Sequence, residues 1–167
     1  MDTYGEDAYD LVLEKAKLQT NDPFVGPGTY PDEDILEIVR VGCEELNIEV
    51  DDFLFKFGVY SFPQLAQRHP VFLENYSHPK DFLKTVEGVI HVEVRKLYDD
   101  TYLPTFRYTD PNEDELIITY YSKRKLYGFM SGLIEGVSNH FNVKIAQTRT
   151  IKEEKGKEVC DFHLKFS

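Results

Sequence analysis

Up to residue 99, apolar side chains recur at the three- and four-residue spacing of amphipathic helices. Residues 21–30 are rich in Gly, Pro, Asn and Asp, which interrupt helices and strands, so a loop is predicted there. Pro31, followed by three acidic residues, is typical of a helix start. A second group of prolines, Pro70 and Pro79, brackets a short connector. The pattern predicts helices over residues 6–18, from Pro31 through Leu46, 51–58, 62–67 and, as the longest, 79–99.

After Pro104 the period of the pattern changes to the alternation expected of β-strands. Residues 110–114 form a turn between the first two β-rich segments. The predicted strands cover residues 105–109, 116–121, 143–151 and 158–166, with one helix over 125–141. The order of elements predicts an α+β fold with a helical N-terminal lobe and an antiparallel C-terminal sheet carrying one long helix.

Composition narrows the class of protein. The 167 residues suit a single domain spanning 1–167, and a 14% share of aromatic residues argues against disorder. The formal net charge of −11 disfavours nucleic acid and anionic membranes as partners. No apolar run is long enough to span a bilayer, and the N-terminus lacks the pattern of a signal peptide. Cys43 and Cys160 form no C-x-x-C pair, so we expect a reduced, cytoplasmic protein.

Common catalytic motifs are missing from the sequence. It contains no G-x-S-x-G, no Walker loop and no G-x-G-x-x-G, and no histidine pair has the helical spacing of a zinc motif. The acidic clusters lie at expected helix starts and turns, where we interpret them as solvated surface. An enzyme that uses His91 or His140 as a base would lack any nucleophile or metal pair, so we expect no enzymatic activity.

Two features suggest binding chemistry. His91 lies inside the longest expected helix, away from its apolar stripe and near Glu87, and Gly88 would let a flat ligand approach on that side. Periodicity alone favours an ordinary exposed or capping histidine. On a strand, Tyr120, Ser122 and Arg124 would share one face and could bind two carboxylates. The alternative for these three is a polar, solvent-facing side of the sheet.

Together these residues resemble the H-NOX family of haem nitric oxide/oxygen binding domains. Tyr120, Ser122 and Arg124 match the family's Tyr-x-Ser-x-Arg signature, and His91 lies 13 residues before Pro104, as the family's iron-binding histidine precedes a proline. The segments 126–136 and 57–58 also look like family segments.

The resemblance implies an H-NOX fold with haem b held between the lobes. His91 would be the only protein ligand of the iron, and the signature residues would hold the haem propionates. Pro104 would press on the porphyrin, while Phe129 and Leu133 would line an apolar cavity.

The sequence departs from the family pattern in two places. It starts later than family members do, so we expect the family's first helix, which covers the distal side of the haem, to be absent from this chain. Some members also bind zinc near the C-terminus. Here only Cys160 resembles a ligand, and Tyr127 and Phe129 stand where cysteines would be, so we expect no structural zinc.

The expected function is a haem-based sensor that binds nitric oxide, and also carbon monoxide, at ferrous haem. Oxygen-binding members carry a tyrosine five residues after the signature arginine, where this chain has Phe129. A histidine kinase or a cyclic-di-GMP enzyme would act as the partner in trans, because the chain has no room for an output domain. The alternative is a binding module of the same fold that takes another apolar ligand, or none, instead of haem.

Overall fold

The computed structural model describes residues 5–21, 24, 30–97 and 101–167. The chain forms two compact units, Met1–Phe53 and Leu54–Ser167. In the first unit, α1 (Gly5–Lys15) packs against α2 (Asp32–Leu46), with Val12 and Val41 among the buried side chains. No helix among the described residues is long and apolar enough to cross a membrane.

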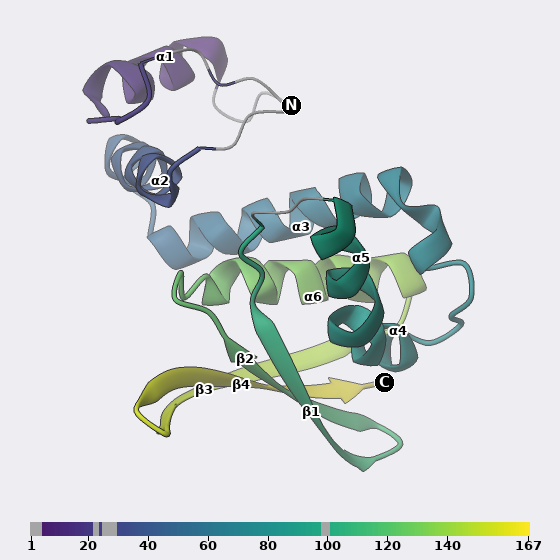
Figure 1. The fold of residues 1–167 in the computed structure, drawn as a ribbon. Helices are drawn as coiled ribbons and strands as arrows, with labels where there is room; N and C mark the ends of the chain where they lie inside the picture. Colours follow the sequence, from purple (N-terminus) through teal and green to yellow (C-terminus); the bar gives the residue numbers. More distant parts are fainter. Residues whose placement is uncertain (1–4, 22–23, 25–29, 98–100) are drawn as a thin grey trace. The chain divides into compact units, whose positions relative to one another are not determined.

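The second unit holds the remaining helices and all the strands of the described chain (Figure 1). Helix α3 (Val50–Arg68) starts before the unit boundary and continues into this unit. The other elements are the 3-10 turn η1 (Pro70–Phe72), α4 (Pro79–Thr85), the π-helix η2 (Val86–Ile90), α5 (His91–Leu97), β1 (Thr105–Asn112), β2 (Glu115–Tyr121), α6 (Tyr127–Phe141), β3 (Ile145–Glu154) and β4 (Lys157–Phe166).

The four strands form one antiparallel sheet in the order β1-β2-β4-β3. In its register, Phe106 lies opposite Tyr120 and Ile118 opposite Phe162. Alternate side chains of β2 and of the end of β4 are buried beneath α6. Together with the buried side chains of α6 they form the apolar core of the unit. The α+β class and the antiparallel sheet predicted from the alternation are confirmed.

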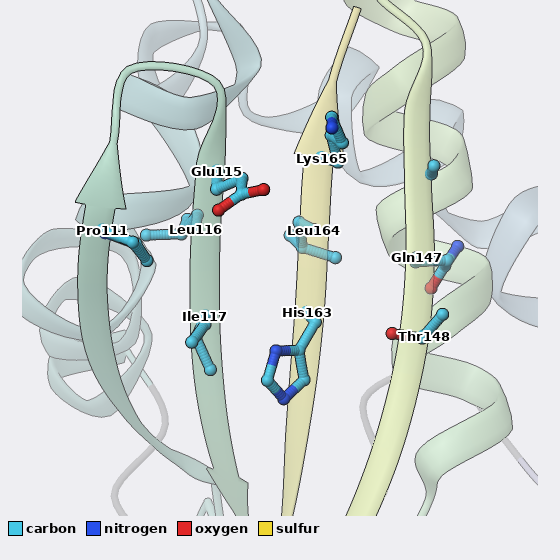
Figure 2. Close-up of a pocket in the computed structure, with 10 residues that line it drawn as sticks. Pro111, Glu115, Leu116, Ile117, Gln147, Thr148, His163, Leu164 and Lys165 are labelled. Carbon is cyan, nitrogen blue, oxygen red and sulfur yellow. The ribbon is translucent and has the colours of Figure 1, made fainter.

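The opposite face of the sheet carries polar side chains and a shallow pocket of about 320 Å³ (Figure 2). Ile117, Thr148 and His163 from three neighbouring strands line it. Cys160 is buried whereas His163 is exposed, as their odd spacing on a strand predicts.

Two glycines allow α3 and α6 to pack with their backbones in contact. A Cβ on Gly58 would lie 2.8 Å from the Cα of Gly132, and a Cβ on Gly132 would lie 2.9 Å from the Cα of Gly58. One turn further along α6, Gly136 lies directly against the ring of Phe62. The close approach fixes these two helices against each other within the second unit.

Several predicted helix boundaries differ in the structure. Helix α3 continues through Gly58 and Pro63 as the longest α-helix, so the separate helices predicted over 51–58 and 62–67 are wrong. Buried Gly58 and Phe62, which pack on α6, hold the backbone on the N-terminal side of Pro63.

The single long helix predicted over 79–99 is a succession of α4, η2 and α5, and residues 98–99 lie outside the described part. Helix α6 starts at Tyr127 rather than Lys125, whose backbone is left-handed with φ of 50°.

Candidate haem site

His91 is the first residue of α5 and follows the π-turn directly. Its backbone N–H bonds to the carbonyl of Val86, five residues earlier, as a π-helix requires. The residue is only 8% exposed, and its Nδ1 lies 3.0 Å from Oε2 of Glu87. Within the described chain the ring makes no second hydrogen bond. Burial lowers the pKa of His91, an effect that Glu87 opposes, so the neutral ring can offer one nitrogen to a metal.

Aromatic rings connect His91 to the signature tyrosine. The ring centroid of Phe106 lies 5.0 Å from that of His91 and 5.8 Å from that of Tyr120. Burial raises the pKa of Tyr120, while hydrogen bonds with Ser122 and with the backbone of Leu126 oppose this rise. The phenol of Tyr120 therefore stays protonated and available as a donor near neutral pH.

The signature continues past the end of β2, because the strand stops at Tyr121. Ser122 and Arg124 therefore belong to the turn after the strand, and the prediction that all three residues lie on one strand is wrong. The turn nevertheless gathers them: Ser122 is buried and hydrogen-bonds with Tyr120, and its Oγ accepts the backbone N–H of Arg124 at 3.2 Å.

Tyr102 joins this cluster from the segment before β1. Its carbonyl accepts a hydrogen bond of 3.0 Å from Nη1 of Arg124, and its ring lies 5.0 Å from the guanidinium carbon. Its hydroxyl accepts the backbone N–H of Lys123 at 2.9 Å. Sequence reasoning missed Tyr102, since only the fold brings it next to Arg124.

The other predicted site residues are Pro104, Phe129 and Leu133. Pro104 is half-buried and immediately precedes β1, two residues before the Phe106 ring that contacts His91. Phe129 and Leu133 are half-buried, one turn apart on α6. The Phe129 ring packs on Phe57 of α3 with centroids 5.4 Å apart, and Leu133 packs against the core.

The donor set fits haem. A porphyrin supplies four nitrogen ligands to its iron, so a single buried imidazole such as His91 suffices from the protein. The guanidinium of Arg124 and the hydroxyls of Tyr120 and Ser122 are the groups that recognise carboxylates such as the two haem propionates. In the part of the chain that the structure describes, no group of three or more His, Cys, Asp or Glu side chains could hold a bare metal ion.

Comparison with known proteins identifies the family. The family model described as "Haem-NO-binding" matches residues 1–149. The ferrous, unliganded H-NOX protein from K. algicida is 28% identical, with a TM-score of 0.92 over 99% of this chain and 89% of that chain.

An H-NOX protein from S. oneidensis, solved in the Fe(II)NO state, is 26% identical, with a TM-score of 0.86 over 98% of this chain and 91% of that one. A mutant of the T. tengcongensis H-NOX, at 22% identity and a TM-score of 0.87, shares the fold over 99% of this chain and 90% of that chain. Among curated proteins, none matches. The chain therefore belongs to the haem-NO-binding family, the H-NOX proteins.

Proposed function

We propose that this protein is a haem-based sensor that binds nitric oxide at ferrous haem b and signals to a partner protein. The observation that carries the proposal is the buried His91, whose Nδ1 is hydrogen-bonded to Glu87 and whose ring contacts Phe106, opposite Tyr120 in the sheet. The similarity to an H-NOX protein solved in its Fe(II)NO state supports nitric oxide as the ligand.

Each site residue has a proposed task. The haem would supply the iron that binds a diatomic gas. His91 would be the protein ligand of the iron, and Pro104 would press on the porphyrin. Tyr120, Ser122 and Arg124 hold the propionates. Phe129 and Leu133 supply apolar side chains to the gas cavity, which carbon monoxide would also enter.

Signalling follows from the position of His91 at the junction of η2 and α5. If His91 were released from the iron, this junction would be free to change its arrangement, and a partner that binds the two arrangements with different affinity would respond to the change. We propose a histidine kinase or a cyclic-di-GMP enzyme as that partner, and binding rather than catalysis as the role of this chain. Two buried, unpaired cysteines support a reducing, cytoplasmic setting.

The first test is the absorption spectrum of the purified protein. We expect a strong Soret band at about one haem per chain, since a single histidine is enough to hold the iron, and a shift of that band when nitric oxide is added to the ferrous form. His91→Gly should lose haem unless imidazole is supplied, whereas His163→Gly, on the open face of the sheet, should keep it. A colourless parent protein would favour the haem-free binding module, and an unchanged spectrum in His91→Gly would refute His91 as the ligand.

The second test concerns the propionates. A charge-assisted hydrogen bond shielded from water contributes about 1.5–3 kcal/mol, so Arg124→Ala should speed haem dissociation by about 10- to 150-fold. Lys123→Ala is the matched control, because that side chain is exposed and one residue away. Equal dissociation rates in both variants would leave Arg124 without a role in haem binding.

A further inference from the structure

One carboxylate, that of Glu87, joins the ligand helix to the sheet. Its Oε2 lies 3.0 Å from Nδ1 of His91 and also accepts the backbone N–H of Phe106 at 3.0 Å. Its Oε1 lies 3.6 Å from Nη2 of Arg95, one turn after His91 on α5. The same carboxylate oxygen, Oε2, therefore contacts both the proposed iron ligand and the first strand.

The backbone of Glu87 makes a second link to the same strand. Glu87 lies within the π-turn η2, and its own N–H donates to the hydroxyl of Tyr108 at 3.3 Å. Phe106 and Tyr108 belong to β1, so the π-turn is held to β1 at two points, both through Glu87. Turns of this kind inside α-helices are frequent at functional sites.

The hydrogen bond to Glu87 determines which nitrogen of the His91 imidazole carries the proton. A carboxylate only accepts hydrogen bonds, so Nδ1 of His91 must carry the proton and donate it to Glu87. The neutral ring then has its lone pair on Nε2. A carboxylate in this position also raises the basicity of the metal-binding nitrogen, as in carboxylate–histidine–metal triads.

We propose that Glu87 is a positioning residue for His91, which holds the ring in the Nε2-ligating tautomer, strengthens its bond to the haem iron and links its position to β1. This inference rests on the proposed function. A stronger bond makes release of His91 on gas binding less favourable, so Glu87 sets how readily the sensor switches. The link through Phe106 carries any displacement of His91 into the sheet.

Two substitutions and one control separate these roles. Glu87→Leu removes the acceptor, whereas Glu87→Gln keeps an acceptor oxygen and loses the charge. Glu93→Gln is the control. Glu93 lies on α5, as His91 does, but it accepts a 2.6 Å hydrogen bond from Lys96 and none from His91. Nitrogen NMR of the isotope-labelled apoprotein reads the tautomer of His91, and resonance Raman of the ferrous protein reads the iron–histidine stretching frequency.

We expect the parent apoprotein to show the proton on Nδ1, Glu87→Gln to keep that tautomer, and Glu87→Leu to become a mixture. In the haem-loaded proteins the iron–histidine frequency should fall from parent to Glu87→Gln to Glu87→Leu, and haem should dissociate about 10- to 100-fold faster from Glu87→Leu. The nitric oxide complex of Glu87→Leu should contain more of the form in which His91 has left the iron. Glu93→Gln should match the parent in all four measurements.

The results distinguish this inference from the proposed function. If the protein takes up haem through His91 but tautomer and frequency are the same in all variants, the positioning role is refuted and the sensor stands. If no haem binds, the proposed function fails and the part of the inference that concerns iron fails with it. A loss of thermal stability alone, without a change of frequency, would show that Glu87 only ties the helix to the sheet, which also overturns the proposal.

Discussion

At the residue scale, we expect Phe129 to decide which gas the proposed haem can hold. Bound dioxygen carries partial negative charge and needs a hydrogen-bond donor, whereas nitric oxide binds ferrous haem tightly without one. Phe129 has no donor, and it packs against the equally apolar ring of Phe57. We expect stable nitric oxide and carbon monoxide complexes and no stable oxygen complex.

Spectra of the ferrous protein in air provide the measurement. Phe129→Tyr places a hydroxyl on α6 and should allow an oxygen complex to form, whereas Phe57→Tyr adds the same hydroxyl to a ring that is 47% exposed and should not. A persistent oxygen complex of the parent protein would show that another side chain supplies the donor.

The sequence suggested some residues of the candidate site and missed others for physical reasons. His91, Tyr120, Ser122 and Arg124 could be proposed because their spacing along the chain matches the signature of the family. Glu87 had a local signal, four residues before His91, but its bond to the N–H of Phe106 depends on how the helix meets the sheet. Such a tertiary contact leaves no periodic pattern in the sequence.

At the element scale, the helices that lead to His91 are anchored at their first turn. Lys80, only 7% exposed, donates hydrogen bonds to the carbonyls of Asn112 at 2.5 Å and Glu113 at 3.2 Å, and it pairs with Asp110 at 2.6 Å. Lys84 pairs with the same Asp110 from an exposed position. The start of α4 is thus fixed to the β1–β2 turn, well before the π-turn.

Replacement of Lys80 should loosen this anchor. Lys80→Met should destabilise the apoprotein by about 2 kcal/mol, because two carbonyls lose their donor. Lys84→Met should change stability little, since exposed ion pairs contribute little. Urea unfolding followed by circular dichroism gives both values, and equal losses in the two variants would contradict the anchor.

The glycines of α3 and α6 give a second prediction for the elements. A methyl group on Gly132 would lie 2.9 Å from the Cα of Gly58, so Gly132→Ala must push the two helices apart and should cost about 1–3 kcal/mol. Gly88 is the contrasting case, because a methyl group there meets nothing within 4 Å. Gly88→Ala should leave the apoprotein as stable as before, or stabilise it by up to about 1 kcal/mol.

Thermal unfolding of the two apoprotein variants compares them directly. A stable Gly132→Ala protein would mean that α3 and α6 can separate at no cost.

The helical period predicted the presence of most elements but not their interruptions. Nothing in the spacing of apolar residues distinguishes the i→i+5 bonds of η2 from those of an α-helix, so the π-turn before His91 was not expected. The break predicted between Gly58 and Phe62 is absent, and the contacts of these two residues with α6 outweigh the cost of Pro63 inside α3. In both cases packing between elements decides a feature that local propensity leaves open.

At the scale of the whole molecule, the chain consists of two compact units with different means of support. The second has a continuous apolar core between α6 and the sheet. In the first, the carboxylate of buried Asp34 joins α2 to the segment after α1, because it accepts the backbone N–H groups of Gln19 and Thr20 at 2.7 and 3.0 Å and also the Thr20 hydroxyl. The sequence showed these acids only as favourable residues at a helix start.

This difference predicts that acid destabilises the first unit through α2. The Thr20 hydroxyl and the backbone N–H of Gln19 lower the pKa of Asp34 below 3.8, and hydrogen bonds from Arg40 and from the backbone of Lys17 lower the pKa of Glu37 to about 2. A carboxyl whose pKa is lower in the folded state stabilises that state above its unfolded pKa. This stabilisation is lost as the pH falls through the folded pKa, so we expect α2 to lose protection progressively below pH 3.8.

Hydrogen exchange of the α2 amides, compared between proteins at the same pH, tests this expectation. Asp34→Asn should lower protection in α2 already at neutral pH and make it depend less on pH in the acid range, while the amides of α6 keep the protection of the parent. Glu33→Gln is the control, because Glu33 is exposed and its side chain makes no hydrogen bond within the described residues. If protection of α2 in the parent stayed constant as the pH fell well below 3.8, the Asp34 carboxylate would not be what holds the first unit together.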